Sequence, residues 1–323
     1  PNQVYDIITS KKPDWQVIIY EMVHTEQLDP WDLDLNLLKK KYFEKINLPV
    51  LAYDPPKSIG SLEELNKAEI VFVCVPTPFI KNGEGFDLSY VKQTVEGLTG
   101  EKVVVVKSTV LPVTTEQLQK EYPQHKFLFN PEFLVEERAL EDMLHPDRQI
   151  IGYTEQSKEV AEEILELLPK APYKKVMPAT EAEMVKYFGN TFLAVKVIFG
   201  CQMYELCQQL GVDYDVVRNA ASADERIGPS HLDVHHGGYR GYGGKCLPKD
   251  TRALIQFADK IGLDLSLHKT AEELNNKLKK ELYKLTEKSE MLETVLPLRV
   301  KNFIRKWREK DRIARLWKPE SIA

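Results

Sequence analysis

Five short apolar runs between residues 48 and 153 constrain the fold of this chain of 323 residues more than any other feature. They are LPVLAYD, EIVFVCVPTP, KVVVVKST, KFLFNPEF and RQIIGY, and helical patterns separate them. Each run is apolar at nearly every position and rich in Val and Ile, which is typical of parallel strands buried on both faces. The sequence therefore predicts an α/β domain over residues 47–175, built on a Rossmann-like, doubly wound parallel sheet.

Helical patterns flank this domain. WQVIIYEMV, residues 15–23, carries apolar residues at helical spacing, and a second helix is expected from DPWDLD to about residue 46. Residues 181–211 form one long helical pattern, and residues 213–285 predict further helices interrupted by a glycine-rich stretch.

Three further regions follow from these patterns: a helical segment over 1–46, a helical domain over 176–286 and a basic amphipathic tail over 287–323. The tail has nine Lys or Arg between Arg299 and Lys318 against two acidic residues. Such a helix can be solvated or contact another subunit, which is our expectation, or it can bind a membrane surface or nucleic acid.

Composition narrows the class of protein. The formal net charge of -5 gives no global basic field, so nucleic acid is not expected as the main partner. Four cysteines without CxxC spacing fit a reducing compartment. No apolar run reaches the roughly 18 residues of a membrane span, and the start lacks a secretory signal pattern. These features predict a cytoplasmic protein, whose natural N-terminus is expected upstream of Pro1 or removed by cleavage.

Polar or rigid residues stand directly after four of the apolar runs, where a doubly wound sheet binds its ligands. Asp54 can accept hydrogen bonds from the hydroxyls of an adenosine ribose, or it can simply cap a turn. The other three positions hold Pro76 and Thr77, Ser108 and Thr109, and Pro131 and Glu132. Together these residues predict a nucleotide site.

The glycine-rich stretch HHGGYRGYGGKCLPKD, residues 235–250, contains Cys246. Its glycines allow close approach of the backbone to a ligand, and Arg240, Lys245 and Lys249 would favour a thiolate. A thiolate beside a nicotinamide can trap an aldehyde and allow a second hydride to leave. Cys74, Cys201 and Cys207 have apolar surroundings and are expected in the core.

Two other groups of polar residues were weighed. Lys186 and Asn190 lie four residues apart, on one helical face, where they can stabilise an oxyanion or form ordinary surface contacts. His231, His235 and His236 form the second group, in which the spacing of His231 and His235 suits a helix. Pro229 and Gly237-Gly238 disfavour a regular helix there and no matching ligand pattern accompanies the histidines, so we expect no metal.

The segments VFVCVPTPF, VVVVKSTVLPVTT, FNPEFLVEERALEDMLHPDRQIIG, EAEMVKYFGNTFLAVKVIF and GYGGKCLPKDTRALI occur in the same order as motifs of a known family. Over residues 40–285 the chain resembles the UDP-glucose/GDP-mannose dehydrogenase family. The resemblance implies oxidation of a nucleotide-sugar C6 alcohol, such as that of a UDP-sugar, to the carboxylate with two NAD per turnover. It also implies a homodimer formed through the helix at 181–211.

The resemblance further implies roles for individual residues. Cys246 is the nucleophile that forms the thiohemiacetal and thioester, Lys186 and Asn190 stabilise the oxyanion, and Glu132 assists proton transfer in hydrolysis. The remaining roles are to order water (Thr109, Asp250), to bind the cofactor (Asp54, Pro76, Thr77, Ser108, Thr109, Lys249) and to bind the substrate (Phe133, Leu134, Glu136, Arg240, Tyr242, Gly243). Arg240 is the arginine that reaches the substrate, in its own subunit or in the partner.

The chain departs from the family pattern at both ends. The first glycine is Gly60, so the GxGxxG turn that seats the NAD pyrophosphate is missing, and we expect the first strand to be missing too. We therefore expect severely weakened NAD binding. The 38 residues after 285 have no room for the family's third domain, which grips the nucleotide.

Residues 13–46 instead resemble the N-terminal helices of the kleisin ScpA, which predicts a chimera and an SMC-type partner. Two alternatives to the dehydrogenase hypothesis remain open at this stage. In the first, the chain is an interaction protein on a degenerate dehydrogenase scaffold. In the second, it is a dehydrogenase that performs a single oxidation and leaves the thiol unused.

Overall fold

The structure of the chain is a computed structural model. It describes residues 17–20, 50–81, 83, 85–134, 138–235 and 239–291. Side chains are described within residues 50–279 of these ranges, apart from Leu140. The predicted helix that ends near residue 46, Glu136, His236 and the basic tail beyond 291 lie outside the described residues.

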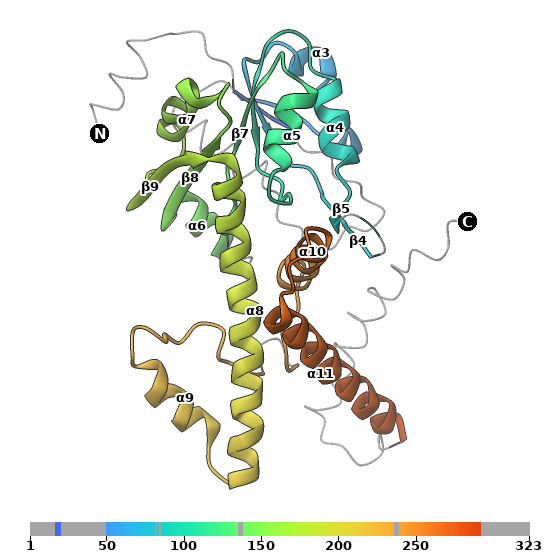
Figure 1. Ribbon diagram of the computed structural model, residues 1–323, viewed down its shortest axis with the longest axis vertical. Helices are drawn as coiled ribbons and strands as arrows, with labels where there is room; N and C mark the ends of the chain where they lie inside the picture. Colours follow the sequence, from blue (N-terminus) through green and yellow to red (C-terminus); the bar gives the residue numbers. More distant parts are fainter. Residues whose placement is uncertain are drawn as a thin grey trace. The chain divides into compact units, whose positions relative to one another are not determined.

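A mixed seven-stranded sheet forms the α/β part of the chain, with the strand order β2-β1-β3-β6-β7-β8-β9 (Figure 1). The strands are β1 (Val17–Tyr20), β2 (Val50–Tyr53), β3 (Ile70–Val73), β6 (Val103–Val106), β7 (Lys126–Phe129), β8 (Arg148–Tyr153) and β9 (Tyr173–Pro178). All five predicted strands are confirmed. The predicted Rossmann-like sheet is confirmed, with one departure from parallel pairing: β8 pairs antiparallel with β7, and β9 joins β8 in parallel.

The prediction that the first strand is missing is wrong. Val17–Tyr20 forms β1, which pairs in parallel with β2 on one side and β3 on the other. The helix predicted over 15–23 is therefore wrong as well. Four apolar residues fit a buried strand and one face of a helix equally well, and here the pairing with two neighbouring strands decides between them.

Helices cover both faces of the sheet, as Figure 1 shows for α4 and α5 on one side and α7 on the other. One core lies beneath α3 (Leu62–Leu65), α4 (Ser89–Glu96) and α5 (Thr114–Glu121), and the other beneath α7 (Ala161–Leu167). Shorter elements are η1 (Pro55–Lys57), β4 (Phe79–Ile80), β5 (Gly85–Phe86), α6 (Ala139–Leu144) and η3 (Lys158–Val160). Val71 and Val73 face the first core, while Ile70 and Phe72 face the second, so alternate residues of one strand fill both.

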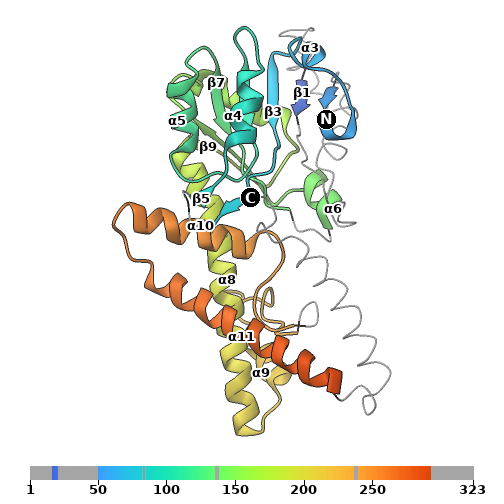
Figure 2. The same cartoon turned by 90° about the vertical axis from the view of Figure 1, so that its right-hand side faces the viewer.

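The helical part contains α8 (Ala179–Leu210), α9 (Tyr214–Ser222), α10 (Leu247–Lys260) and α11 (Ser266–Met291), and the long helix predicted over 181–211 is confirmed as α8. The chain divides into two compact units, residues 1–190 with 252–263 and residues 191–251 with 264–323. In the second unit α11 crosses α8 in Figure 2, and Figure 1 shows the start of α11 beside α8. Ala194, Ile198 and Ala271 pack there with Tyr242.

None of the helices in the described part of the chain has both the length and the apolar character needed to cross a membrane.

Candidate active site

Asp54 lies at the carboxyl end of β2 and is completely buried. Its carboxylate accepts a hydrogen bond from the Lys57 backbone N–H at 3.4 Å and lies 3.3 Å from the Lys57 ammonium. Asp54 thus caps the short helix η1, which is the structural alternative considered for it. Its position beside the end of β1 also suits a ribose ligand, so the predicted cofactor role stays open.

The ends of β3 and β6 are joined by side-chain hydrogen bonds. The Ser108 hydroxyl donates to the Val75 carbonyl at 2.6 Å and accepts from the Val75 N–H at 2.8 Å. The Thr77 hydroxyl donates to the Thr109 carbonyl at 2.7 Å. These bonds hold the two strand ends together, while Pro76 is exposed and Thr109 half-buried beside them. A flat ligand could therefore reach Pro76 and Thr109, whereas the Ser108 hydroxyl is occupied by the backbone.

A buried lysine links the ends of β6 and β7. The Lys107 ammonium donates to the Asn130 side-chain oxygen at 2.6 Å and lies 3.1 Å from Glu132 Oε2. The Asn130 amide nitrogen donates to the Ile150 carbonyl of β8 at 2.8 Å, which turns its oxygen toward Lys107. Glu132 is thus part of a polar network that spans three neighbouring strands.

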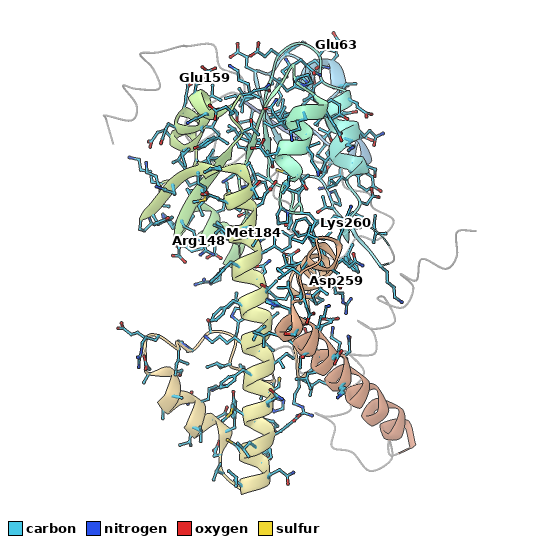
Figure 3. The ribbon with its side chains drawn as sticks, viewed as in Figure 1. Glu63, Arg148, Glu159, Met184, Asp259 and Lys260 are labelled. Atoms are coloured by element: carbon cyan, nitrogen blue, oxygen red, sulfur yellow. The ribbon has the colours of Figure 1, made fainter. Side chains whose placement is uncertain are left out.

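Lys186 on α8 reaches the same loop after β7. Its ammonium donates to the Glu132 carbonyl and lies 5.9 Å from the centre of the Phe133 ring. The Arg148 guanidinium covers that ring at 3.9 Å, and Figure 3 shows Arg148 near Met184, which marks the early turns of α8. Asn190 is half-buried one turn after Lys186. The predicted residues Glu132, Phe133 and Lys186 therefore lie together in the first unit.

A cavity of about 200 Å³ opens beside this cluster. Its lining includes Lys107, Glu132, Phe133, Leu134 and Arg148. Carboxylate, cationic and aromatic groups facing one cavity form the kind of surface that binds a polar ligand such as a sugar. The cavity thus gives Glu132, Phe133 and Leu134 access to a small molecule.

Glu183 is a second buried carboxylate, and it fixes the start of α8 to the start of α5. It accepts hydrogen bonds from the Val113 N–H at 2.6 Å, the Thr115 N–H at 2.8 Å and the Thr115 hydroxyl at 2.6 Å. Burial raises the pKa of Glu183 to about 7, although the donors of Thr115 and Val113 act in the opposite direction. The carboxylate thus supplies acceptors to N–H groups at the start of α5.

We expect Glu183 to make stability depend on pH. Because its pKa is raised by folding from 4.5 to about 7, the folded chain binds a proton there that the unfolded chain has released, and stability falls as pH rises through this window. The fall is on the order of 3 kcal/mol. Urea unfolding at about pH 5 and about pH 8 should show it in the wild type and show much less of it in Glu183→Gln. Glu181→Gln, which changes an exposed carboxylate on the same helix, should retain it; equal pH dependence in both variants would contradict this role.

In the second unit, Cys246 directly precedes α10 and is an exposed free thiol. Its carbonyl accepts the Asp250 N–H at 2.9 Å, which is the first hydrogen bond of the helix. The N-terminus of a helix favours negative charge, so this position suits a nucleophile that reacts as an anion. Asp250 is almost fully buried, and the Lys249 ammonium lies 2.9 Å from its carboxylate.

The glycine-rich loop that ends at Cys246, residues 239–246, contains two glycines whose backbone lies close to neighbouring side chains. Gly241 has φ +91°, and a Cβ there would lie 2.4 Å from the Asn275 side-chain oxygen. A Cβ at Gly243 would lie 2.0 Å from the Tyr239 hydroxyl oxygen. Larger residues would therefore push the loop away from α11 and from its own tyrosine.

Tyr242 is held in the core of the second unit. Asn275 of α11 accepts the Tyr242 N–H at 2.8 Å and donates to the Tyr242 carbonyl at 3.1 Å. The Tyr242 hydroxyl donates to Glu272 at 2.5 Å, and the side chain is 2% exposed. Its side chain thus supports the loop that carries Cys246, and its predicted contact with substrate stays a prediction.

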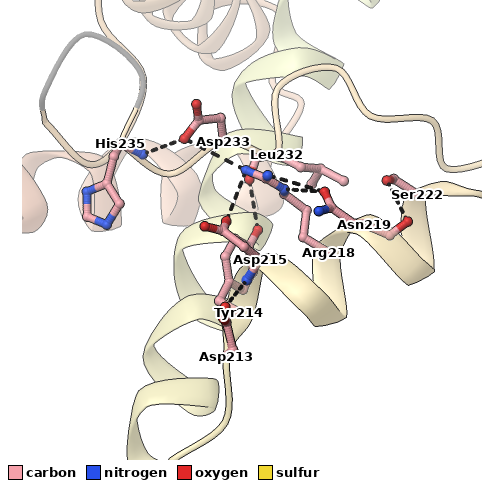
Figure 4. A network of polar contacts seen from close by, with 9 residues as sticks. All are labelled: Asp213, Tyr214, Asp215, Arg218, Asn219, Ser222, Leu232, Asp233 and His235. Atoms are coloured by element: carbon pink, nitrogen blue, oxygen red, sulfur yellow. Dashed lines mark hydrogen bonds and ion pairs between the residues drawn. The ribbon is translucent and has the colours of Figure 1, made fainter.

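Arg240 lies on the surface of α8 in this structure, where its guanidinium pairs with Glu205 at 2.9 Å. The segment that contains Asp233 and His235 is held by the polar network in Figure 4, in which Arg218 contacts Asp215 and Asp233. His235 donates its backbone N–H to Asp233 within that network. Among the described residues no group of three His, Cys, Asp or Glu side chains could hold a metal ion, and His236 is not described.

Sequence reasoning missed Lys107, Asn130, Glu183 and Asn275. Of these four, only Lys107 could have been recognised from the sequence. It directly follows four valines, so its ammonium must either reach solvent from the buried strand end or find a polar partner there. The other three are recognisable only once the elements that they join are known to be neighbours.

Comparison with known proteins matches two segments of the chain to one family. Residues 58–169 match the NAD binding domain of the UDP-glucose/GDP-mannose dehydrogenase family, and residues 180–277 match the central domain of that family. The chain belongs to this family. The NAD binding domain match covers the strand-end residues from Pro76 to Glu132, and the central domain match covers both Lys186 and Cys246.

Individual members of the UDP-glucose/GDP-mannose dehydrogenase family show the same relationship. The UDP-glucose 6-dehydrogenase TuaD of Bacillus subtilis is 36% identical over 227 residues, 66% of this chain and 47% of its own length. The UDP-glucose 6-dehydrogenase of Pseudomonas aeruginosa is 37% identical over 241 residues, 68% of this chain and 51% of its own length. The chain thus spans about half the length of these relatives.

A solved structure agrees with this assignment to the dehydrogenase family. The UDP-glucose dehydrogenase of Pyrobaculum islandicum is 28% identical and superposes with a TM-score of 0.73, over 86% of this chain and 72% of that one. The kleisin resemblance of residues 13–46 is not addressed by these relatives. Only Val17–Tyr20 of that segment is described, and it is a strand instead of a predicted helix.

Proposed function

We propose that the chain is an NAD-dependent nucleotide-sugar 6-dehydrogenase that oxidises the C6 alcohol of a UDP-sugar to the carboxylate. The observation that carries this proposal is the exposed thiol of Cys246 at the N-terminus of α10, in a family of dehydrogenases. A simple alcohol dehydrogenase has no need of such a nucleophile. Conversion of an alcohol to an acid does need one, because the aldehyde must be converted into a species that can lose a second hydride.

The cofactor would lie along the carboxyl ends of β2, β3 and β6. Asp54 is suited to the ribose, Pro76 and Thr109 to a flat ring, and Lys249 to a phosphate. When bound, NAD accepts a hydride in each of the two oxidations. The sequence has no glycine before Gly60, so it lacks the glycine-rich turn that seats a pyrophosphate in dinucleotide-binding folds.

The chain's own residues divide the chemistry between them. Lys186 and Asn190 would stabilise negative charge on the oxygen attached to C6. The Cys246 thiolate would add to the aldehyde carbon, and after the second oxidation the resulting thioester would be hydrolysed with Glu132 accepting a proton from water. Thr109 and Asp250 would order that water, while Phe133, Leu134, Glu136, Arg240 and Gly243 would surround the sugar.

Activity is tested by incubating the full chain with a high concentration of NAD and each member of a panel of UDP-sugars, and recording NADH absorbance. We expect NADH to form with one sugar and the matching uronic acid to appear in the product. Absence of NADH with every sugar would contradict the proposal. The interaction-protein alternative has no supporting observation among the described residues, and its SMC-type partner stays a prediction.

We also propose a homodimer formed through α8. Exposed apolar side chains recur along one face of this helix at Phe188, Phe192, Phe199, Leu206 and Leu210, and their exposed fractions are 50% or more. These positions fall within a narrow stripe at 3.6 residues per turn. A stripe of this kind on one helix fits a partner that presents the same face.

The double variant Phe199→Asp, Leu206→Asp should convert this dimer to a monomer, because charges within an apolar interface are poorly solvated. Sedimentation velocity at several protein concentrations measures the change. Gln208→Asp, an exposed residue on the opposite face of α8, should leave the dimer intact. A wild-type chain that is monomeric throughout the concentration range would contradict the proposal.

A further inference from the structure

Lys107 is buried directly after β6, with 8% of its surface exposed. Placing an ammonium group inside a protein is unfavourable unless partners compensate for the lost water. The partners here are the Asn130 side-chain oxygen at 2.6 Å and Glu132 Oε2 at 3.1 Å. The position of the ammonium is therefore determined by two side chains of the loop that follows β7.

This arrangement restricts the Glu132 carboxylate from both sides. Oε2 faces Lys107, and Oε1 accepts the Phe133 N–H at 3.0 Å. A nearby ammonium and a backbone donor both attract the carboxylate oxygens. The orientation of Glu132 is thus fixed at the edge of the cavity that it lines.

Asn130 makes the arrangement rigid. Its amide nitrogen donates to the Ile150 carbonyl, so its oxygen can only face Lys107 in this rotamer. The polar network thereby joins Glu132 to the backbone of β8 through two completely or almost completely buried side chains. Movement of Glu132 would leave a buried ammonium without its counter-charge, which is costly.

We propose that Lys107 is a positioning residue for the hydrolytic step of the reaction, and this inference rests on the proposed function. In that step the oxygen of water forms a bond to the thioester carbon, and the C–S bond breaks. The Cys246 thiolate leaves with the electron pair, and the proton of water passes to Glu132. Lys107 acts through Glu132 by holding its carboxylate in position, and it does not take part in either hydride transfer.

The test compares Lys107→Met with Lys102→Met in the full chain. Lys102 directly precedes the same strand, is 8% exposed as Lys107 is, and donates to the Asn66 carbonyl at 2.8 Å. Both variants remove a buried ammonium from an end of β6. We expect steady-state turnover to fall about 10²-fold in Lys107→Met and to stay within a factor of about two of wild type in Lys102→Met.

The form of the defect distinguishes positioning from a general loss of structure. In Lys107→Met, a rapid burst of two NADH per active site should precede the slow phase, and intact mass spectrometry should show the uronyl group retained on Cys246. Lys107→Met should add little to the defect of Glu132→Gln, since both act on one step. Lys107→Gln, which keeps a donor toward Asn130, gives the same measurement if the methionine variant does not fold.

Three results would overturn the proposal. They are loss of both the NADH burst and the slow phase in Lys107→Met, additive defects in the double variant Lys107→Met, Glu132→Gln, and equal turnover defects in Lys107→Met and Lys102→Met. The same assay separates it from the proposed function. A wild-type chain that forms no NADH overturns both, whereas an active wild type with an unaltered Lys107→Met overturns this inference alone.

Discussion

Serine in place of Cys246 is expected to lower the complete oxidation of the sugar by a factor on the order of 10⁴ or more, as removal of a nucleophile does in other enzymes with covalent intermediates. Serine fits the position before α10, but its hydroxyl is a weak nucleophile without an adjacent base. The aldehyde would then have no covalent route to the acid. NADH formation and product analysis measure the loss.

Cys207→Ala is the matched control because it removes a thiol that is 5% exposed in the core of the second unit. It should alter stability more than turnover per folded molecule. Wild-type rates of acid formation in Cys246→Ser would contradict the assignment of the nucleophile, whatever the effect on stability.

NAD is expected to bind with a dissociation constant of about 1 mM or weaker. The reason is the segment between β1 and β2, residues 21–49, which contains no glycine. In dinucleotide-binding folds a glycine-rich turn at this place brings backbone N–H groups to the pyrophosphate at a helix N-terminus. Residues 21–49 offer no position without a side chain, which is the reason for the weak binding that we expect.

Calorimetric titration of the purified chain with NAD measures this affinity. Asp54→Ala should weaken the remaining binding if the ribose lies at the end of β2. Binding in the micromolar range would contradict the expectation, and tight binding that survives Asp54→Ala would place the cofactor elsewhere. Activity assays should accordingly use NAD at several times the measured dissociation constant.

The strands of the sheet that are isolated apolar runs were predictable from the sequence. VVVV at 103–106 and IVFV at 70–73 are short runs rich in β-branched residues, which favour strands, and both are strands. VIIY at 17–20 was misassigned because four apolar residues satisfy the helical and the strand pattern alike. Only its neighbours β2 and β3, distant in sequence, determine which one forms.

The sequence predicted several residues of the candidate site, but it could not predict which of them contact one another. Glu132 and Lys186 were singled out from strand-end and helix positions, and the structure joins them through the Glu132 carbonyl. Lys107 was overlooked, since its value depends on the adjacency of β6 and β7. Glu183 was overlooked for the same reason, because only the fold brings it to the start of α5.

We propose that this chain carries out two successive oxidations at one carbon through a thiol. The most direct measurement counts NADH per sugar consumed, with NAD in excess and UDP-sugar limiting. We expect two NADH for each molecule of sugar, with the uronic acid as product. One NADH per sugar, with an aldehyde as product and no dependence on Cys246, would contradict it.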